Sequence, residues 1–318
     1  MKPEISFEVE HANACLKEKL LQHLPKQDRI DTAIEGLTIF RRDETFKRES
    51  CFYQPVIGVV VQGSKRSIIG NEEYQYGEYY CMAAGVDMPS LNHITVASAD
   101  KPFLAVSIKL DRYLITQLMT EVPKLAASIQ KPIDAPVKGI VVTEVSHDIL
   151  NAFLRLVELL DHPERIPVLA PMIIREIHYL LLTGPKGECL RMVSVLGTQA
   201  NRIARAISWL RDNYTAPLDI NTLAQRVNMA PSSFHRHFRR MTTLSPLQFQ
   251  KRLRLYEAER LMLAEGHDTI SAALKVGYES ATQFNREYKR QFGEPPHRDV
   301  TKKRLIGINM EDITYPVV

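Results

Sequence analysis

The sequence predicts an α+β fold in two parts, with a β-rich N-terminal part that ends in a pair of helices and an all-helical C-terminal part. Three observations predict it. Short apolar or alternating runs separated by turn formers fill residues 34–110. Apolar residues at helical spacing then recur over residues 146–183. From residue 199 to Gly293 the pattern is helical throughout. The 318 residues are enough for two domains.

The N-terminal part begins with an irregular helical stretch over residues 1–30, which breaks at Pro25. Six short runs follow, and their spacing is typical of an antiparallel sandwich or barrel: IEGLTIF, VIGVVVQG, KRSIIG, YQYGEYYCMAA, NHITVAS and FLAVSIKL. Residues 146–161 and 168–183 each place Leu and Ile on one stripe, as amphipathic helices do. Such stripes pack either on the chain's own sheet or on a second copy of the chain, and the sequence leaves both open.

Composition and charge narrow the class of protein. No run approaches the roughly 18 apolar residues of a membrane span, and the acidic N-terminus is unlike a secretory signal. We therefore expect a cytoplasmic protein with no membrane partner. The net charge is +4, but residues 201–304 hold 19 Lys and Arg against 10 Asp and Glu. Such a local excess is expected of a domain that binds a polyanion.

The four cysteines, at positions 15, 51, 81 and 189, show no C-x-x-C spacing. This argues against a structural zinc site and against a disulfide framework. Cys51 and Cys81 both fall in the β-rich region, where an exposed thiol near a cation could react with an electrophile or an oxidant. A thiol-based sensor therefore remains an alternative.

A repeat organises the C-terminal part. The stretch APSSFHRHFRRMTTLSP at 230–246 aligns with SATQFNREYKRQFGEPP at 280–296, so that Phe234 pairs with Phe284 and Arg236 with Arg286. These pairs are fifty residues apart. Just upstream the two copies continue to align, with a spacing of forty-nine residues. Two copies of a helix-turn-helix follow, with helices at about 219–227 and 231–242, and at about 269–276 and 281–292.

The segment between the two copies, residues 246–264, is also helical and would be about 28 Å long at 1.5 Å per residue. Successive major-groove segments on one face of DNA lie about 34 Å apart. A helix of this length could therefore hold two groove-reading units one turn apart.

In each copy the second helix has an apolar face and a polar, basic face. At about 100° per residue, Phe234 and Phe238 point into a small core. His235 and His237 diverge by about 200° and cannot share a metal ion, as an i, i+4 pair could; we expect no metal and no cofactor. Arg suits guanine and Gln suits adenine. The last basic pair of each helix is better placed for phosphates: Arg239, Arg240, Lys289 and Arg290.

The two second helices differ at their N-termini. Ser280 can accept a hydrogen bond from the first free backbone N–H groups. Its counterpart Ala230 cannot, although Pro231 suits a first helical turn. The first copy therefore has the less stable helix start.

These residues carry a resemblance. The C-terminal hundred residues resemble the DNA-binding domain of AraC/XylS transcription regulators, through LAQRVNMAPSSFHRHFRR, RLRLYEAERLML and VGYESATQFNREYKRQFGEPP. The resemblance implies seven helices, and it implies that bases are read by Ser232, Ser233, Arg236, Thr282, Gln283 and Arg286.

The first two hundred residues resemble, less specifically, the sensing and dimerising N-terminal domain of one branch of that family, a branch that includes regulators of aldehyde- and alcohol-metabolising genes. The match rests on QPVIGVVVQGSKRSIIGNEEYQYGEYYCMAAGVDMP and IIREIHYLLLTGPKGECL. It implies a cupin-like barrel followed by a helical pair used for dimerisation.

We therefore expect a cupin-like sensing domain at 1–198, a double helix-turn-helix DNA-binding domain at 199–304 and a tail at 305–318 with no assigned role. The expected partners are double-stranded DNA, RNA polymerase, a second copy of the chain and a small-molecule effector. Candidates for the effector pocket are Tyr53, Tyr76, Cys51 and Cys81, with further aromatic residues at Tyr74, Tyr79, Tyr80 and Phe103. Neither the effector nor the regulated genes can be read from the sequence, and activation or repression depends on where the DNA site lies.

An enzyme is the other class considered. A metal-dependent cupin needs several histidines and a carboxylate, whereas residues 34–110 contain a single histidine, His93. No nucleophile and base stand out either. We expect no catalytic residues, and a cupin-type enzyme fused to a DNA-binding domain is the least favoured alternative.

Overall fold

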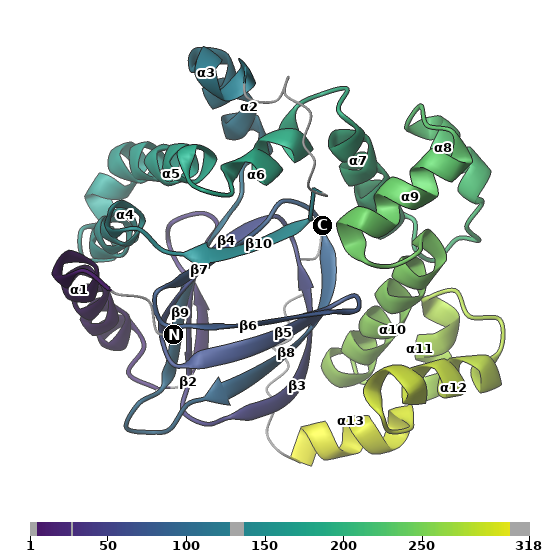
Figure 1. The fold of residues 1–318 in the computed structure, drawn as a ribbon. Coiled ribbons are helices and arrows are strands. Elements are labelled where there is room, and N and C mark those ends of the chain that lie inside the picture. Colours follow the sequence, from purple (N-terminus) through teal and green to yellow (C-terminus); the bar gives the residue numbers. More distant parts are fainter. Residues whose placement is uncertain (1–4, 27, 128–136, 306–318) are drawn as a thin grey trace.

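Two antiparallel sheets form the centre of the molecule, and helices cover them on two sides (Figure 1). The computed structural model describes residues 5–26, 28–127 and 137–305. The larger sheet has the strand order β1-β2-β9-β4-β7-β10, comprising β1 (Asp28–Asp31), β2 (Leu37–Arg42), β9 (Phe103–Lys109), β4 (Val56–Gln62), β7 (Tyr80–Ala84) and β10 (Ile140–Glu144). The smaller sheet has the order β3-β8-β5-β6, comprising β3 (Phe46–Tyr53), β8 (Met88–Val96), β5 (Ser64–Ile69) and β6 (Glu72–Gly77).

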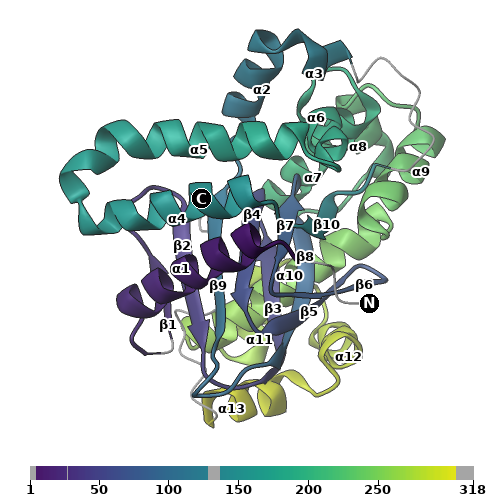
Figure 2. The same ribbon diagram turned by 60° about the vertical axis from the view of Figure 1, so that its left-hand side comes forward.

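Alternation along the strands gives the larger sheet two apolar faces. On β4, Val59 and Val61 belong to the core shared with the N-terminal helices, whereas Val60 belongs to the core on the other face. Figure 2 shows α1 (Phe7–His23) and α4 (His147–Glu158) lying across the outer face, with α5 (Ile166–Thr183) beyond them. Asn13 of α1 ties helix to sheet, because its amide donates to the Val61 carbonyl at 2.9 Å.

The β-rich region and the pair of helices confirm the predicted mixed architecture of the N-terminal part. The closure of the strands into a cupin-like barrel stays a prediction. Strand β1 begins within the stretch 1–30 that was expected to be helical and irregular, and β3 lies outside the six predicted runs. Further elements were not expected: α2 (Arg112–Glu121), α3 (Pro123–Ala127), β10, and α6 (Gly187–Ser194). The segment 187–198, which joins the two parts, is in large part this last helix.

The C-terminal part is all-helical, as predicted. Over residues 199–305 the structure has the seven helices that the family resemblance implies: α7 (Gln199–Asp212), α8 (Ile220–Arg226), α9 (Pro231–Thr242), α10 (Pro246–Ala264), α11 (Thr269–Lys275), α12 (Ala281–Phe292) and α13 (Pro296–Leu305). The last of these lies beyond Gly293, where the apolar pattern ends. The rest of the expected tail, residues 306–318, lies outside the described residues.

The C-terminal helices pack directly on the sheets. Residues of both sheets share one apolar core with α7, α8 and α9, and Leu91 of β8 lies in the core of the last four helices. Polar contacts add to this. Asp87, only 1% exposed, pairs with Arg211 at 2.9 Å, and the Asn71 N–H donates to Thr243 Oγ1 at 2.9 Å. The first helix-turn-helix is therefore held against the β-rich part in this structure.

One segment corrects an expectation from the sequence. Residues Pro163–Thr183, with a mean hydropathy of 1.4, are long and apolar enough to cross a membrane by length and composition alone. The stretch includes α5, whose inner side chains Ile173, Ile177 and Leu181 are buried in the core with α4. In this packing 33% of its most apolar 18-residue portion is buried, and outer side chains such as Val168 and Met172 stay exposed.

Candidate nucleic-acid interface

The repeat found in the sequence extends to the start of the first helix in each unit. Asp219 caps α8, and its carboxylate accepts from the Asn221 and Thr222 N–H groups. Asp268, forty-nine residues on, caps α11 in the same way through the N–H groups two and three residues further along. An Asp at this position satisfies backbone donors that have no partner within the helix.

The turns of the two units are also equivalent. Asn228 and Gly277 both adopt a positive φ, 54° and 86°. The next residue in each turn donates its N–H back to the first helix, Met229 to the Ala224 carbonyl at 2.9 Å and Tyr278 to that of Ala273 at 3.0 Å. Asn and Gly are the residues that tolerate this left-handed conformation best.

Replacing Gly277 with alanine is expected to lower the free energy of unfolding by about 2–4 kcal/mol, because backbone strain and a clash act together. A Cβ at Gly277 would lie 2.2 Å from the Thr215 carbonyl oxygen. Gly266 is a matched control, since it also has a positive φ but has no atom within 4 Å of an added Cβ. Gly266→Ala should cost only the strain, about 1–2 kcal/mol. Urea unfolding of both variants checks this, and equal losses would contradict it.

Aromatic side chains fix the second helix of each unit. Phe234 and Phe238 of α9 are fully buried, and Phe238 packs edge-to-face on Phe249 of α10 at 5.5 Å. In α12 the equivalent Phe284 and Tyr288 are also fully buried. The opposite faces of α9 and α12 are thereby turned to solvent, as the helical periodicity predicts.

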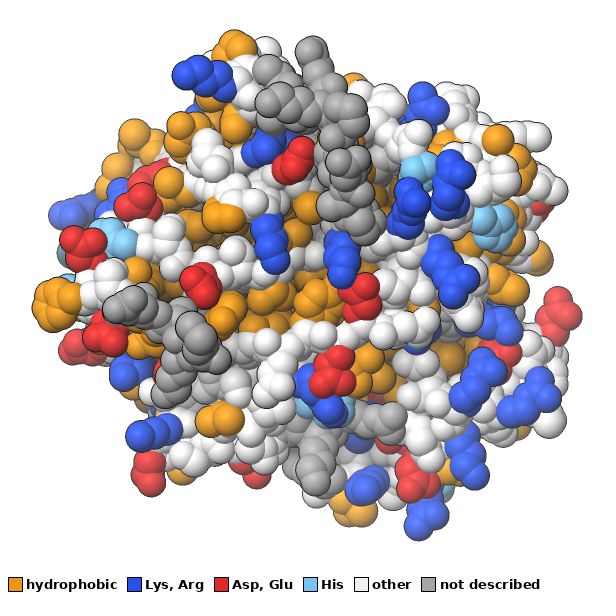
Figure 3. Space-filling view, viewed as in Figure 1, with side chains coloured by type: hydrophobic (Ala, Val, Ile, Leu, Met, Phe, Trp, Pro, Cys, Tyr) orange, Lys and Arg blue, Asp and Glu red, His pale blue; other side chains and the backbone are white. Residues whose placement is uncertain are grey.

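The outward faces hold the residues expected to contact DNA. These side chains are exposed, except Ser233, which is half-buried: Ser232, Ser233, Arg236, Arg239 and Arg240 on α9, and Thr282, Gln283, Arg286, Lys289 and Arg290 on α12. Among the described residues, none of the six Arg and Lys side chains in this set makes an ion pair. Figure 3 shows Lys and Arg side chains gathered over the C-terminal helices, at the right of the view. This surface has the charge that a polyanion requires.

Two side chains on these helices differ from the simple two-face pattern. Gln283 lies at the exposed face, but its amide donates to Glu287 Oε1 at 3.3 Å, which orients it. His237 is half-buried, and burial lowers its pKa, as do the adjacent charges of Arg236 and Arg240. In the part of the chain that the structure describes, no group of three His, Cys, Asp or Glu side chains is placed to hold a metal ion.

The N-termini of α9 and α12 differ as expected. Ser280 Oγ accepts from the Gln283 N–H at 3.3 Å, whereas Ala230 makes no side-chain cap and Pro231 opens the helix. Replacing Ala230 with serine is therefore expected to raise the free energy of unfolding by about 0.5–2 kcal/mol. The reverse change, Ser280→Ala, should lower it by a similar amount. Chemical denaturation checks both, and a destabilising Ala230→Ser would show that α9 starts differently.

Helix α10 does more than connect the two units. Arg254 lies on this helix, and its guanidinium donates to the carbonyls of Tyr214, Thr215, Ala216 and Gly277, at 2.7–3.0 Å. These carbonyls come from the segment after α7 and from the turn of the second unit. Arg254 therefore locks the second helix-turn-helix to the first, a role that the sequence pattern did not reveal.

A cavity of about 370 Å³ lies between the two sheets. Of the residues expected to form an effector pocket, Tyr53, Tyr76, Cys51 and Phe103 line it. Cys81 does not, because it is buried on the opposite face of its strand in the core with the N-terminal helices. Burial raises the pKa of the Cys81 thiol to about 12, so the reactive thiolate is disfavoured there. The thiol-sensor alternative thus finds no support in the position of Cys81.

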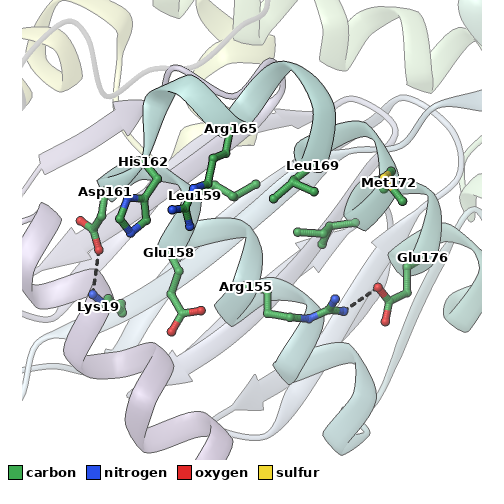
Figure 4. Close-up of a pocket in the computed structure, with 11 residues that line it drawn as sticks. Lys19, Arg155, Glu158, Leu159, Asp161, His162, Arg165, Leu169, Met172 and Glu176 are labelled. Carbon is green, nitrogen blue, oxygen red and sulfur yellow. Dashed lines mark hydrogen bonds and ion pairs between the residues drawn. The ribbon is translucent and has the colours of Figure 1, made fainter.

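A second hollow, of about 590 Å³, lies between α1, α4 and α5 (Figure 4). Its charged side chains largely pair with one another: Lys19 with Asp161 at 2.7 Å, and Arg155 with Glu176 at 2.5 Å. Leu169 and Met172 of α5 add an apolar side. Because these charges are already matched, the hollow is a weaker candidate for an ionic ligand than the cavity between the sheets.

Comparison with known families identifies the chain. The family described as "AraC-type transcriptional regulator N-terminus" matches residues 33–189, and a "Helix-turn-helix domain" family matches residues 223–301. The chain belongs to the AraC-type transcriptional regulators.

Curated relatives agree with this membership. The HTH-type transcriptional activator RhaS of Escherichia coli (strain SMS-3-5 / SECEC) is 25% identical over 163 residues, which are 50% of this AraC-type chain and 57% of RhaS. The HTH-type transcriptional regulator ExsA of Pseudomonas aeruginosa is 28% identical over 166 residues, 52% of this chain and 59% of ExsA. The match thus spans somewhat more than half the length of these relatives.

Among solved structures, ToxT of Vibrio cholerae has the same fold. ToxT bound to (E)-4-(8-methylnaphthalen-1-yl)but-3-enoic acid superposes with a TM-score of 0.53 at 12% identity, over 83% of this AraC-type chain and 97% of ToxT. Unsaturated fatty acid-bound ToxT gives a TM-score of 0.52 at 8% identity, over 87% and 97%. At such low identity the likeness concerns the fold alone. It shows the combination of an N-terminal β-sheet part and a C-terminal helical part.

Proposed function

We propose that the protein is a sequence-specific, DNA-binding transcription regulator whose two helix-turn-helix units read successive major-groove segments. One observation carries the proposal. Arg236 and Arg286 occupy equivalent positions, fifty residues apart, on the second helices of two repeated units, where both are exposed and neither makes an ion pair among the described residues. A second helix with an Arg-bearing polar face suits entry into the major groove.

The roles of the individual side chains divide by position on the helix. We assign base contacts to the N-terminal two turns of each second helix: Ser232, Ser233 and Arg236, and Thr282, Gln283 and Arg286. The basic residues one turn further on are assigned to phosphates: Arg239, Arg240, Lys289 and Arg290. Phosphate contacts position a protein on DNA, and base contacts carry its specificity.

In this proposal, residues 1–198 form the sensing domain and residues 199–304 the DNA-binding domain. The sensing domain would receive a small-molecule effector in the cavity between the sheets, whose volume of about 370 Å³ lies in the usual range for ligand pockets. ToxT, which shares the fold, has been solved with organic acids bound. The sequence resemblance further suggests the branch that includes regulators of aldehyde- and alcohol-metabolising genes.

A transcription regulator of this kind also has protein partners. We propose a homodimer formed through the helices of the sensing domain, because α5 exposes the apolar side chains of Val168, Leu169 and Met172. RNA polymerase is the expected protein partner at a promoter. We propose that the protein acts in the cytoplasm by binding and not by catalysis; its relatives RhaS and ExsA are named as transcriptional regulators.

Genome-wide mapping of the sites bound by the full-length chain tests the proposal. We expect bound regions to cluster near promoters and to share a motif of two short blocks on one face of the DNA. Bound regions with no common motif would contradict sequence-specific binding. The genes next to the bound sites would also test the suggested branch.

A further inference from the structure

The cavity between the sheets contains a lysine that has no acidic partner in the part of the chain that the structure describes. Lys65 of β5 lines the cavity, and its ammonium donates to the Tyr53 hydroxyl at 3.2 Å. The same nitrogen lies over the rings of Tyr53 and Tyr76, 5.5 and 5.4 Å from their centroids. Among the described residues, Lys65 makes no ion pair with any carboxylate. Lys65 is half-buried, and a charge taken out of water is ordinarily paired.

Lys65 keeps its charge at neutral pH. Burial lowers the pKa of its ammonium, but the interactions with Tyr53 and Tyr76 more than offset this, so that the pKa lies above its ordinary value. Burial also raises the pKa of Tyr53, which keeps that hydroxyl protonated. The Tyr53 hydroxyl therefore supplies no negative charge that would neutralise Lys65.

The surrounding hydrogen bonds leave Lys65 free to bind another group. Asn92 Oδ1 accepts from Tyr53 Oη at 2.9 Å, from Ser67 Oγ at 2.7 Å and from Ser90 Oγ at 3.1 Å. This network fixes the tyrosine hydroxyl so that its oxygen faces the ammonium. An ammonium has three N–H donors, and Tyr53 accounts for one.

The rest of the cavity is apolar or basic. Its apolar lining includes Phe52, Met82, Ile94, Phe103 and Val106. Among the described residues its charged lining comprises Lys65, Lys109, Arg29 and Arg42 with one acid, Asp31, which pairs with Arg29 at 3.0 Å. A polyhydroxylated ligand would need many more polar partners than these walls offer. An acid with an apolar body matches both the cation and the walls.

We propose that this cavity binds a small organic carboxylate, with its carboxylate on Lys65 and its apolar body against the aromatic and aliphatic lining. The inference rests on the proposed function, because it names the chemical class of the effector. It assigns the anion site to residues of the smaller sheet.

The position of the site relates it to the DNA-binding helices. Along β8, Asn92 and Ile94 line the cavity, whereas Leu91 faces the other way and packs with Leu255 and Tyr256 of α10. Residues that alternate along β8 thus contact the cavity on one side of the sheet and α10, the helix that joins the two helix-turn-helix units, on the other. A carboxylate on Lys65 would lie one strand away from that helix.

Matched ligands test the proposal on the full-length chain. The probes are 4-phenylbutyrate and decanoate, each compared with the alcohol of the same skeleton, by calorimetric titration at pH 7. We expect at least one carboxylate to bind and its alcohol to bind at least tenfold more weakly. Lys65→Met should weaken carboxylate binding at least tenfold, Lys65→Arg should restore part of it, and the exposed control Lys101→Met should leave it unchanged. Equal binding of acid and alcohol, no binding of either acid, or full binding by Lys65→Met would overturn the proposal.

Two further measurements keep the test decisive. Lys65→Gln, which keeps a polar N–H donor but removes the charge, should also weaken carboxylate binding, so the site is tested even if Lys65→Met does not fold. DNA binding by each ligand-free variant is measured in parallel. Normal DNA binding without carboxylate binding would overturn only this inference, whereas loss of specific DNA binding by the wild-type chain would overturn the proposed function.

Discussion

Replacing Phe284 with alanine is expected to lower the free energy of unfolding of the C-terminal helices by about 3–5 kcal/mol. Phe284 is fully buried and packs against Tyr278 at 5.2 Å and Tyr288 at 5.5 Å. Its removal leaves a cavity at the centre of the second helix-turn-helix. Because the outward face of α12 depends on this core, specific DNA binding should be lost together with stability.

Urea unfolding and DNA titration of the full-length variant check this expectation. Leu274 of the neighbouring helix α11 is 62% exposed and provides the control. Leu274→Ala should change the free energy of unfolding by less than about 0.5 kcal/mol. If Phe284→Ala were as mild as the control, the ring would not hold α12 in place.

Replacing Arg236 or Arg286 with alanine is expected to cost about 1–3 kcal/mol of binding free energy at the cognate site, a loss of about 5- to 150-fold. Each variant should also relax the preference for the base pair that its arginine contacts. Both side chains are exposed and lie outside the cores of their units, so stability should change little. Selection of bound duplexes from variant libraries of the site measures the altered preference.

Lys289 provides the matched contrast on the same helix as Arg286. Lys289→Ala should weaken binding to all sequences alike and reduce the slope of log affinity against log salt by about one. Titrations of specific and random duplexes at several salt concentrations separate the two kinds of residue. If the Arg and Lys variants lost affinity equally on both duplexes, the division into base and phosphate contacts would be wrong.

The C-terminal helices could be predicted closely because each carries a local signal. The repeat at about fifty residues, the aromatic pairs such as Phe234 and Phe238, and the cap at Ser280 all act over one or two helical turns. Helix α13 lacks such a signal, since among its side chains Val300 is the one buried aliphatic residue. The hydrogen bonds of Arg254 connect carbonyls that are far apart in the sequence, so no local sequence pattern predicts them.

The β-rich part was predicted in outline, and its ligand site was not. Strand alternation shows that Cys81 and Met82 face opposite ways, but it does not show which face the helices cover. The structure places Met82 in the cavity and Cys81 under the helices. Lys65 likewise gave no signal, because a lysine within a polar strand is usually at the surface. Its significance depends on Tyr53, Tyr76 and Asn92, which neighbouring strands bring around it.

The most direct test of the central claim is selection by the full-length chain from a pool of random duplexes, followed by sequencing of the bound DNA. Two helix-turn-helix units joined by α10 predict enriched sequences with two conserved blocks whose centres lie about 10–11 base pairs apart. In the Arg286→Ala variant one block should lose its preference while the other remains. Enrichment of a single block, or of no sequence, would contradict the account of two units that read adjacent turns of one duplex.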